Sequence, residues 1–289
     1  AVLVELDPAR MSGAGVTVAA IRQPIDMADQ FGVIEVDDED PTKISAFREK
    51  PSDPKGLPDS PDEILASMGN YVFTADVLVD AVTRDHDLAG SRHDMGGDIV
   101  PALVARDAAY TYDFKKNVIP GGTDRDKGYW RDVGTLDSYF DAHMDLISIH
   151  PIFNLYNYDW PIYTDYGPYP PAKFVHGAHG RFGEALNSAV SPGTVISGAR
   201  VTNSVIGANC RVHSYSELDQ VVMLDNVTIG RQCRIQRAII DKNVNVPDGT
   251  SIGFDREHDL ARGFTVTESG LTVVGKGSSQ LEDLLKTVL

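Results

Sequence analysis

The sequence has few cysteines and no long apolar run, and its first residues do not resemble a secretory leader. Its 289 residues include two cysteines, Cys210 and Cys233, neither in a His/Cys spacing that binds structural zinc. Although the two could pair, so few cysteines fit a reduced compartment with buried free thiols better. No apolar run approaches the roughly 20 residues that cross a bilayer, and the start AVLVELDPAR has no basic or long apolar region. We therefore expect a cytoplasmic protein with no membrane partner.

Basic residues are also in deficit. The chain has 26 Lys and Arg against 42 Asp and Glu, a formal net charge of −16. Proteins that bind nucleic acid need clustered cations to neutralise phosphates, so nucleic acid is excluded as a partner. A small phosphorylated ligand remains compatible, because a few placed cations and backbone amides suffice to bind it.

The N-terminal half alternates predicted strands and helices, which is typical of an α/β fold. β-branched and apolar runs predict strands in GVTVAAI, FGVIEVDD, KISAFREKP and ASMGNYVFT, and helical spacing predicts helices in ADVLVDAV and GGDIVPALVAR. We expect a loop from Ser52 to Glu63. Thr135 is expected to cap a further helix, whose apolar face carries Leu136, Phe140, Met144 and Ile147.

The pattern changes between Pro151 and Lys173, a segment rich in aromatic residues and proline with no clean period. We expect a connector or a segment wrapped along an interface. Its aromatic side chains are predicted to pack rather than to line a ligand site.

The clearest regularity of the chain follows this connector. Apolar residues recur at six-residue steps, at Val195, Val201, Ile206, Val212, Leu218, Ile229, Ile235, Val246 and Ile252, and glycines follow several of them, at Gly198, Gly207, Gly230 and Gly253. Such spacing indicates a parallel β-helix of hexapeptide repeats, in which each coil is stabilised by stacking on the next. The tail from Thr265 predicts a strand pair that turns at Ser269-Gly270, then a helix with Leu281, Leu284, Leu285 and Leu289 in the core.

Several strings carry more specific information. In order along the chain they are FREKP, SMGNYVF, HDMGGDIVP, YWRDVGTLDSYFDAHMDL and FNLYNYDWPI, followed by PPAKFV, NSAVSPGTVISG and AIIDKNV. These strings resemble the C-terminal two thirds of the ADP-glucose pyrophosphorylase (glucose-1-phosphate adenylyltransferase) family, over nearly the whole chain. The resemblance implies a nucleotidyltransferase of glycogen biosynthesis that forms ADP-glucose and pyrophosphate from ATP and glucose 1-phosphate.

The resemblance also implies the fold. We expect an incomplete α/β nucleotide-diphospho-sugar-transferase domain, Rossmann-like, followed by a left-handed parallel β-helix of hexapeptide repeats. The predicted parts are the C-terminal part of the α/β domain over 1–150, a connector over 151–185, and the β-helix with its tail over 186–289. The family further suggests a homotetramer.

Two neighbouring charged residues form the first part of the implied site. In the family, the lysine matching Lys50 contacts the phosphate of glucose 1-phosphate, and the glutamate matching Glu49 bonds sugar hydroxyls. A point cation for phosphate and a carboxylate for hydroxyls suit a sugar phosphate. On spacing alone, the same residues are a solvated ion pair in a loop.

Four more residues complete the implied sugar pocket. By resemblance Ser67 bonds the sugar, Asp94 and Met95 line the same pocket, and Trp130 packs against the sugar. Without the family, Asp94 is an ordinary helix-cap acid. His93 has no partner at a ligand spacing, and we assign it no role.

Asp132 is the implied catalytic and metal-binding residue. Nucleotidyl transfer requires neutralisation of developing charge, usually by Mg²⁺ held by carboxylates. The family aspartate in WRDVGT is one of two that hold this ion, and Arg131 is expected to hold the loop. The alternative interpretation is a buried ion pair between Arg131 and Asp132.

Lys242 and Lys276 match cations that bind an anionic allosteric effector in some family members.

Part of the family pattern does not occur in this sequence. The glycine-rich phosphate loop GGxGxRLxPLT, its following lysine and the first metal-binding aspartate are absent. We therefore expect the sequence to be part of a longer polypeptide and inactive alone. The alternatives are a second chain that supplies the rest, a degenerate relative, or a non-catalytic regulatory or scaffolding subunit of the same family. A hexapeptide acyltransferase is disfavoured, because it leaves the N-terminal strings unexplained.

Overall fold

The computed structural model describes residues 14–164, 167–178 and 180–277. The chain divides into two compact units, Ala1–Trp130 and Arg131–Leu289. This division groups the helix that follows Thr135 with the β-helix, whereas the sequence-based boundary at 150 counts that helix with the α/β part. We describe each unit by itself.

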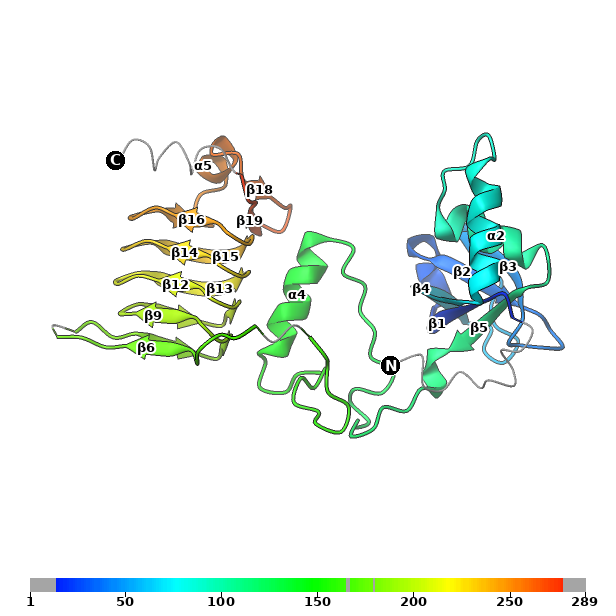
Figure 1. Ribbon diagram of the computed structural model, residues 1–289, viewed down its shortest axis with the longest axis horizontal. Helices are drawn as coiled ribbons and strands as arrows, with labels where there is room; N and C mark the ends of the chain where they lie inside the picture. Colours follow the sequence, from blue (N-terminus) through cyan, green and yellow to red (C-terminus); the bar gives the residue numbers. More distant parts are fainter. Residues whose placement is uncertain (1–13, 165–166, 179, 278–289) are drawn as a thin grey trace. The chain divides into compact units, whose positions relative to one another are not determined.

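A five-stranded mixed sheet forms the core of the first unit, in the order β3-β2-β4-β1-β5 (Figure 1). Only β1 and β5 pair in parallel, and the other neighbours are antiparallel. The four strands predicted from apolar runs are confirmed, and β5 is an addition. Their bounds are β1 (Val16–Pro24), β2 (Gly32–Val36), β3 (Ile44–Glu49), β4 (Glu63–Phe73) and β5 (Ala109–Asp113).

Short helices connect and cover this sheet. Both predicted helices are confirmed, the first as α2 (Ala75–His86) and the second as the π-helix η3 (Met95–Ile99) continued by α3 (Val100–Val104). Pro101 lies in the first turn of α3, where its missing N–H is tolerated. The 3-10 helices η2 (Ile25–Gln30) and η4 (Phe114–Lys116) were not predicted.

The second unit contains the β-helix of hexapeptide repeats that the six-residue steps predict, left-handed as the resemblance implies, and Figure 1 shows its strands stacked as rungs. Parallel pairing joins residues 17 positions apart on successive coils, as in Arg211 with Thr228 and Thr228 with Asn245. One face comprises β6 (Lys173–Val175), β9 (Val195–Ser197), β12 (Arg211–Val212), β14 (Thr228–Ile229) and β16 (Asn245–Val246). The other two comprise β7 (Glu184–Leu186), β8 (Ala189–Val190), β10 (Arg200–Thr202), β11 (Val205–Ile206), β13 (Glu217–Met223), β15 (Arg234–Ile240), β17 (Ser251–Ile252) and β19 (Thr272–Val274).

The predicted apolar positions fill the interior of this β-helix. Of the nine, eight are buried, and Val195 is half-buried beside the fully buried Ile196. The corners between strands place asparagines in the left-handed region, which asparagine tolerates better than most residues. Asn209, Asn226 and Asn243 stack on successive coils, with side-chain hydrogen bonds of 2.9 and 3.2 Å. Cys210 and Cys233 are buried free thiols, as predicted.

Helix α4 (Leu136–Leu146) packs on the β-helix through Phe140, which contacts Val222, Ile239 and Leu271. Thr135 is its N-cap, as predicted, and forms a capping box with Ser138. Leu136 is 41% exposed rather than packed, because the apolar contact of α4 begins at Tyr139 and Phe140.

Aromatic residues of the connector do not pack as predicted. Tyr156, Tyr158 and Tyr163 are 73%, 85% and 89% exposed. The prediction that the connector's aromatic side chains pack is therefore wrong for these three tyrosines within this chain. The prediction that the connector wraps along an interface stays a prediction.

The last described elements are α5 (Arg256–Ala261) and the antiparallel pair of β18 (Thr265–Val266) with β19, which confirms the predicted strand pair. The predicted final helix with Leu281, Leu284, Leu285 and Leu289 lies outside the described residues. Within the described part of the chain, no helix has the length and apolar character needed to cross a membrane.

Candidate functional site

Three neighbouring strands of the first unit bring predicted site residues into one row. Glu49, the last residue of β3, pairs with Gly32, the first residue of β2. Val33 pairs with Ala66 of β4, so the antiparallel register places Ser67 opposite Gly32. Side chains directly opposite each other in a sheet lie on the same face. Glu49 and Ser67 therefore flank Gly32, whose position carries no side chain.

Lys50 follows directly at the end of β3. Its backbone takes the left-handed conformation, with φ of 48°, and its N–H donates to the carbonyl of Phe31 at 3.0 Å. The side chains of Glu49 and Lys50 are both exposed. Neither takes part in any ion pair found among the described residues, which argues against the alternative interpretation of a solvated Glu-Lys pair. Both charges are available to a ligand.

Tyr71 of β4 is a member of this cluster that sequence reasoning missed. Burial raises the pKa of its hydroxyl, the negative charges of Asp94 and Glu49 raise it further, and a hydrogen bond with Ser67 acts in the opposite direction. These influences place the Tyr71 hydroxyl among three predicted site residues. Its position in the string SMGNYVF was the available signal, since the string is part of the family resemblance.

Asp94 is both a helix cap and a neighbour of this hydroxyl. Its Oδ1 accepts from the N–H of Gly97 at 2.5 Å and so caps η3, as the alternative interpretation predicts. A Cβ on Gly96 would lie 3.6 Å from Asp94 Oδ1, from the Tyr71 hydroxyl and from the Phe47 ring, which locates all three around Gly96. Met95 packs against the core of the unit behind them. The cap role therefore fixes Asp94 at the edge of the cluster.

Trp130 ends the first unit and stands beside the same strand ends. Its ring meets Phe31 edge to face, with centroids 5.9 Å apart. The Phe31 carbonyl accepts from Lys50, so one residue connects Trp130 with the predicted phosphate-binding lysine. Six predicted residues, Glu49, Lys50, Ser67, Asp94, Met95 and Trp130, thus belong to the first unit.

Asp132 belongs to the second unit, and its carboxylate is exposed. That exposure contradicts the alternative of a buried ion pair, and none of the ion pairs found among the described residues includes Arg131 or Asp132. The described residues hold no group of three or more His, Cys, Asp or Glu that could bind a metal ion. Asp132 is therefore an exposed carboxylate that belongs to no such group.

Lys242 and Lys276 meet at one carboxylate of the second unit. The backbone N–H of Lys242 donates to Asp241 Oδ1 at 2.7 Å, and that of Lys276 donates to Asp241 Oδ2 at 3.2 Å. The two lysines follow β15 and β19, which pair in parallel up to Ile240 and Val274. Both side chains are exposed. The structure therefore brings the two predicted effector residues together.

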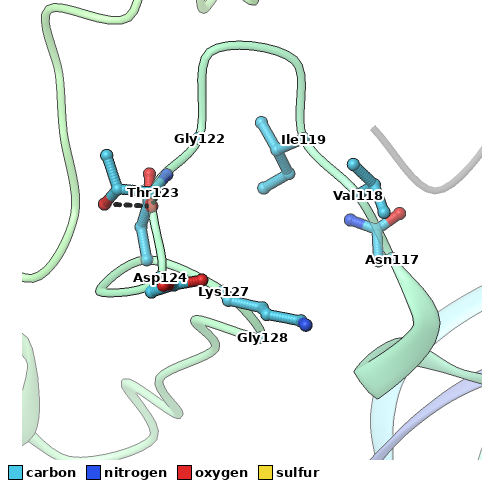
Figure 2. A pocket seen from close by; sticks show the side chains of 9 residues that line it. Asn117, Val118, Ile119, Gly122, Thr123, Asp124, Lys127 and Gly128 are labelled. Carbon is cyan, nitrogen blue, oxygen red and sulfur yellow. Dashed lines mark hydrogen bonds between the residues drawn. The ribbon is translucent and has the colours of Figure 1, made fainter.

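A separate hollow of about 210 Å³ lies within the loop that leads to Trp130 (Figure 2). The loop is closed by Asp126, whose Oδ1 accepts from the N–H and the hydroxyl of Thr123 at 2.5 and 2.9 Å. None of the predicted site residues lines it. Its lining consists of Asn117, Val118, Ile119, Gly122, Thr123, Asp124, Asp126, Lys127 and Gly128.

Comparison with known proteins identifies the family of each part of the chain. Residues 5–149 match the family model described as nucleotidyl transferase, and residues 170–274 match that of the GlmU-like C-terminal hexapeptide. Among curated relatives, the glucose-1-phosphate adenylyltransferase of Leifsonia xyli subsp. xyli is 58% identical over 266 residues, 92% of this chain and 64% of that protein. The enzyme of that name from Parafrankia sp. is 56% identical over 94% of this chain and 67% of its own length, and that from Bifidobacterium adolescentis is 54% identical over 92% and 64%. The chain thus spans about two thirds of the length of these relatives.

Proposed function

Because the chain belongs to the glucose-1-phosphate adenylyltransferase family, we propose that it carries the glucose 1-phosphate half of a nucleotidyltransferase site. The reaction is formation of ADP-glucose and pyrophosphate from ATP and glucose 1-phosphate, in glycogen biosynthesis. One observation carries the proposal: the row of Glu49, Gly32 and Ser67, with the Tyr71 hydroxyl and Asp94 at its edge.

The chemistry of this cluster suits a sugar phosphate. Glu49 and Asp94 offer carboxylate oxygens that accept from sugar hydroxyls, and Ser67 and Tyr71 offer hydroxyls that donate or accept. Lys50 offers an ammonium to the phosphate. Trp130, braced by Phe31, offers an aromatic face to the C–H groups of the sugar ring.

In the proposed reaction, a phosphate oxygen of glucose 1-phosphate attacks the α-phosphorus of ATP, and pyrophosphate leaves. The residues of this chain orient the nucleophile, because Lys50 holds the phosphate while the carboxylates hold the sugar. Mg²⁺ usually takes one or two carboxylates, together with substrate phosphates and water, and the exposed Asp132 fits as one such ligand. Bound there, the ion would neutralise charge that develops on the phosphates.

Three further properties belong to the same proposal. An anionic effector binds at Lys242 and Lys276, which Asp241 holds together. The protein assembles as a homotetramer, and the exposed tyrosines of the connector supply surface for contacts between copies. It acts in the cytoplasm, where the two buried thiols stay reduced.

Calorimetric titration of the chain with glucose 1-phosphate tests the sugar half. We expect Lys50→Gln to weaken binding by about 10- to 150-fold, the equivalent of a lost hydrogen bond to a charged group of about 1.5–3 kcal/mol. Lys55→Gln is the matched control, because Lys55 pairs with Asp38, beyond the opposite end of β2. Equal affinity in the two variants would remove Lys50 from the site.

Turnover is tested in the full-length protein by Mg²⁺-dependent pyrophosphorolysis of ADP-glucose. We expect Asp132→Asn to abolish most of it and to leave glucose 1-phosphate binding unchanged. A wild-type rate in this variant would contradict the metal role. Sugar phosphate binding without turnover in the wild-type protein would instead support the non-catalytic subunit.

A further inference from the structure

A buried carboxylate outside the described site fixes the loop that precedes Asp94. Asp85, in the last turn of α2, is 6% exposed. Its Oδ1 accepts from the Ser91 hydroxyl at 2.7 Å, and its Oδ2 lies 2.7 Å from Nδ1 of His93. The Ser91 hydroxyl in turn accepts from the backbone N–H of His93 at 3.0 Å. Asp85 therefore holds both ends of the turn from Ser91 to His93.

This arrangement determines which ring nitrogen of His93 carries the proton. The hydrogen bonds from His93 and Ser91 lower the pKa of Asp85, so its carboxylate is ionised at neutral pH. An ionised carboxylate only accepts hydrogen bonds, and Nδ1 must therefore donate. The His93 side chain is 56% exposed, and its ring faces His86 of α2 at 6.3 Å between centroids.

The backbone of His93 is held in an uncommon conformation. Its φ is 57°, in the left-handed region, which only a few per cent of non-glycine residues adopt, although asparagine, aspartate and histidine do so more often than the others. Strain of this kind persists only where the surrounding contacts maintain it, and it gathers at functional sites. Here the contacts that maintain it are those of Asp85 and Ser91.

The strained residue directly precedes Asp94. A second carboxylate, that of Asp98, accepts from the N–H groups of Arg92 and Asp94 at 3.2 and 3.1 Å. Asp94 then accepts from Gly97. The segment from Ser91 to Asp98 is thus closed on one side by Asp85 and on the other by Asp98, and the direction of the Asp94 carboxylate depends on both closures.

We propose that His93, held by Asp85, is a positioning residue that sets the Asp94 carboxylate for the sugar hydroxyls of glucose 1-phosphate. This role rests on the proposed function, since Asp94 is taken as a sugar ligand. His93 itself contacts no substrate. It fixes the backbone turn that delivers Asp94 to the cluster of Tyr71, Ser67 and Glu49.

Two substitutions of His93 separate its hydrogen bond from its backbone conformation. Asparagine tolerates the left-handed region, and its side-chain amide can donate in place of Nδ1. Glycine adopts the conformation freely but has no side-chain donor. We therefore expect His93→Asn to retain the function of the turn and His93→Gly to lose it. His86→Asn, a change of the neighbouring histidine, is the control.

The experiment combines NMR with titration of glucose 1-phosphate into the full chain. In the wild type we expect ring ¹⁵N shifts typical of an Nδ1–H tautomer at His93. In His93→Gly we expect faster amide exchange at Asp94 and Gly97 and about tenfold weaker sugar phosphate binding. In His93→Asn and His86→Asn both quantities should stay within about twofold of wild type.

The outcomes separate this inference from the proposed function. Unchanged affinity and unchanged amide exchange in His93→Gly would overturn the positioning role. Equal losses in His93→Asn and His93→Gly would also overturn it, because the donor would then be irrelevant. If the wild type binds no glucose 1-phosphate, the proposed function fails, and the amide exchange of His93→Gly alone decides whether Asp85 and His93 fix the turn.

Discussion

Gly32 offers the sharpest test of the row that defines the site. It is paired with Glu49 across β2 and β3. A Cβ added at Gly32 would lie 3.0 Å from Cζ of Phe47 and 3.1 Å from Oε2 of Glu49. Ordinary van der Waals contact needs about 3.5 Å or more. In Gly32→Ala, the Glu49 carboxylate must therefore retreat by roughly half an ångström.

The size of the effect follows from what the carboxylate does. A hydrogen bond to a charged group contributes about 1.5–3 kcal/mol, and a partial displacement forfeits the lower part of that range. We expect Gly32→Ala to weaken glucose 1-phosphate binding by about tenfold. Stability should not fall in parallel, because alanine within a strand is favoured over glycine by about 0.5–1 kcal/mol.

A double-mutant cycle identifies the cause. Affinities for glucose 1-phosphate are measured by calorimetry for Gly32→Ala, Glu49→Gln and the double variant, with thermal melts of each. If alanine acts by displacing Glu49, the loss of binding free energy in the double variant will be smaller than the sum of the losses in the two single variants. Strict additivity, or a loss of affinity that tracks a loss of melting temperature, would refute this reasoning.

Three further predictions concern other parts of the molecule. Gly253→Ala should destabilise the β-helix by about 1–3 kcal/mol more than Gly249→Ala in urea unfolding. Both glycines have a positive φ, but of the two added Cβ atoms only the one at Gly253 meets a backbone oxygen, that of Gln236, at 1.8 Å. Equal losses of stability would contradict the clash. Burial raises the pKa of the Cys210 and Cys233 thiols, so both should resist a thiol reagent at pH 8 in the folded protein and react once unfolded. The pKa of Asp85 lies below its ordinary value of 3.8 because of the hydrogen bonds from His93 and Ser91. The ionised carboxylate therefore stabilises the turn from Ser91 to His93 fully above about pH 4, and this stabilisation is lost as the pH falls through the lowered pKa. Amide exchange at Gly97, relative to its intrinsic rate, should increase over the same pH range.

Regular burial is the part of this fold that sequence reasoning predicts well. The six-residue steps identify the buried interior of the β-helix, because each apolar position meets its equivalents on adjacent coils and needs no distant partner. The strands β1 to β4 are equally visible as apolar runs. By contrast, β5 was missed, since its short stretch AYTYD acquires its strand conformation by pairing with β1, some 90 residues earlier.

The site shows the same limit. Glu49, Lys50, Ser67 and Asp94 were predicted through the resemblance, but no local pattern indicates that β2 places Gly32 between Glu49 and Ser67. His93 was assigned no role for a similar reason. Its partner Asp85 is eight residues away, on a different element, and the spacing matches no ligand motif. Contacts between elements, rather than residue types, determine these roles.

The absence of a side chain at Gly32 leaves space for the proposed sugar ligand between the ends of β3 and β4. Adjacent strands lie about 4.8 Å apart, so the backbones of Glu49 and Ser67, on either side of β2, are about 10 Å apart. With any larger residue at position 32, the space between them would be filled, as the 3.1 Å approach of a Cβ to Glu49 indicates. Glycine leaves an open space over β2 that is one strand wide, with the Glu49 carboxylate on one side and the Ser67 hydroxyl on the other. Sheet hydrogen bonds fix that spacing, while Asp94 approaches from η3, whose preceding turn is held by Asp85 and His93. In the proposed function, recognition of the sugar therefore depends on the fixed spacing of the strands and on the Asp94 carboxylate, whose position can change without unfolding of the sheet.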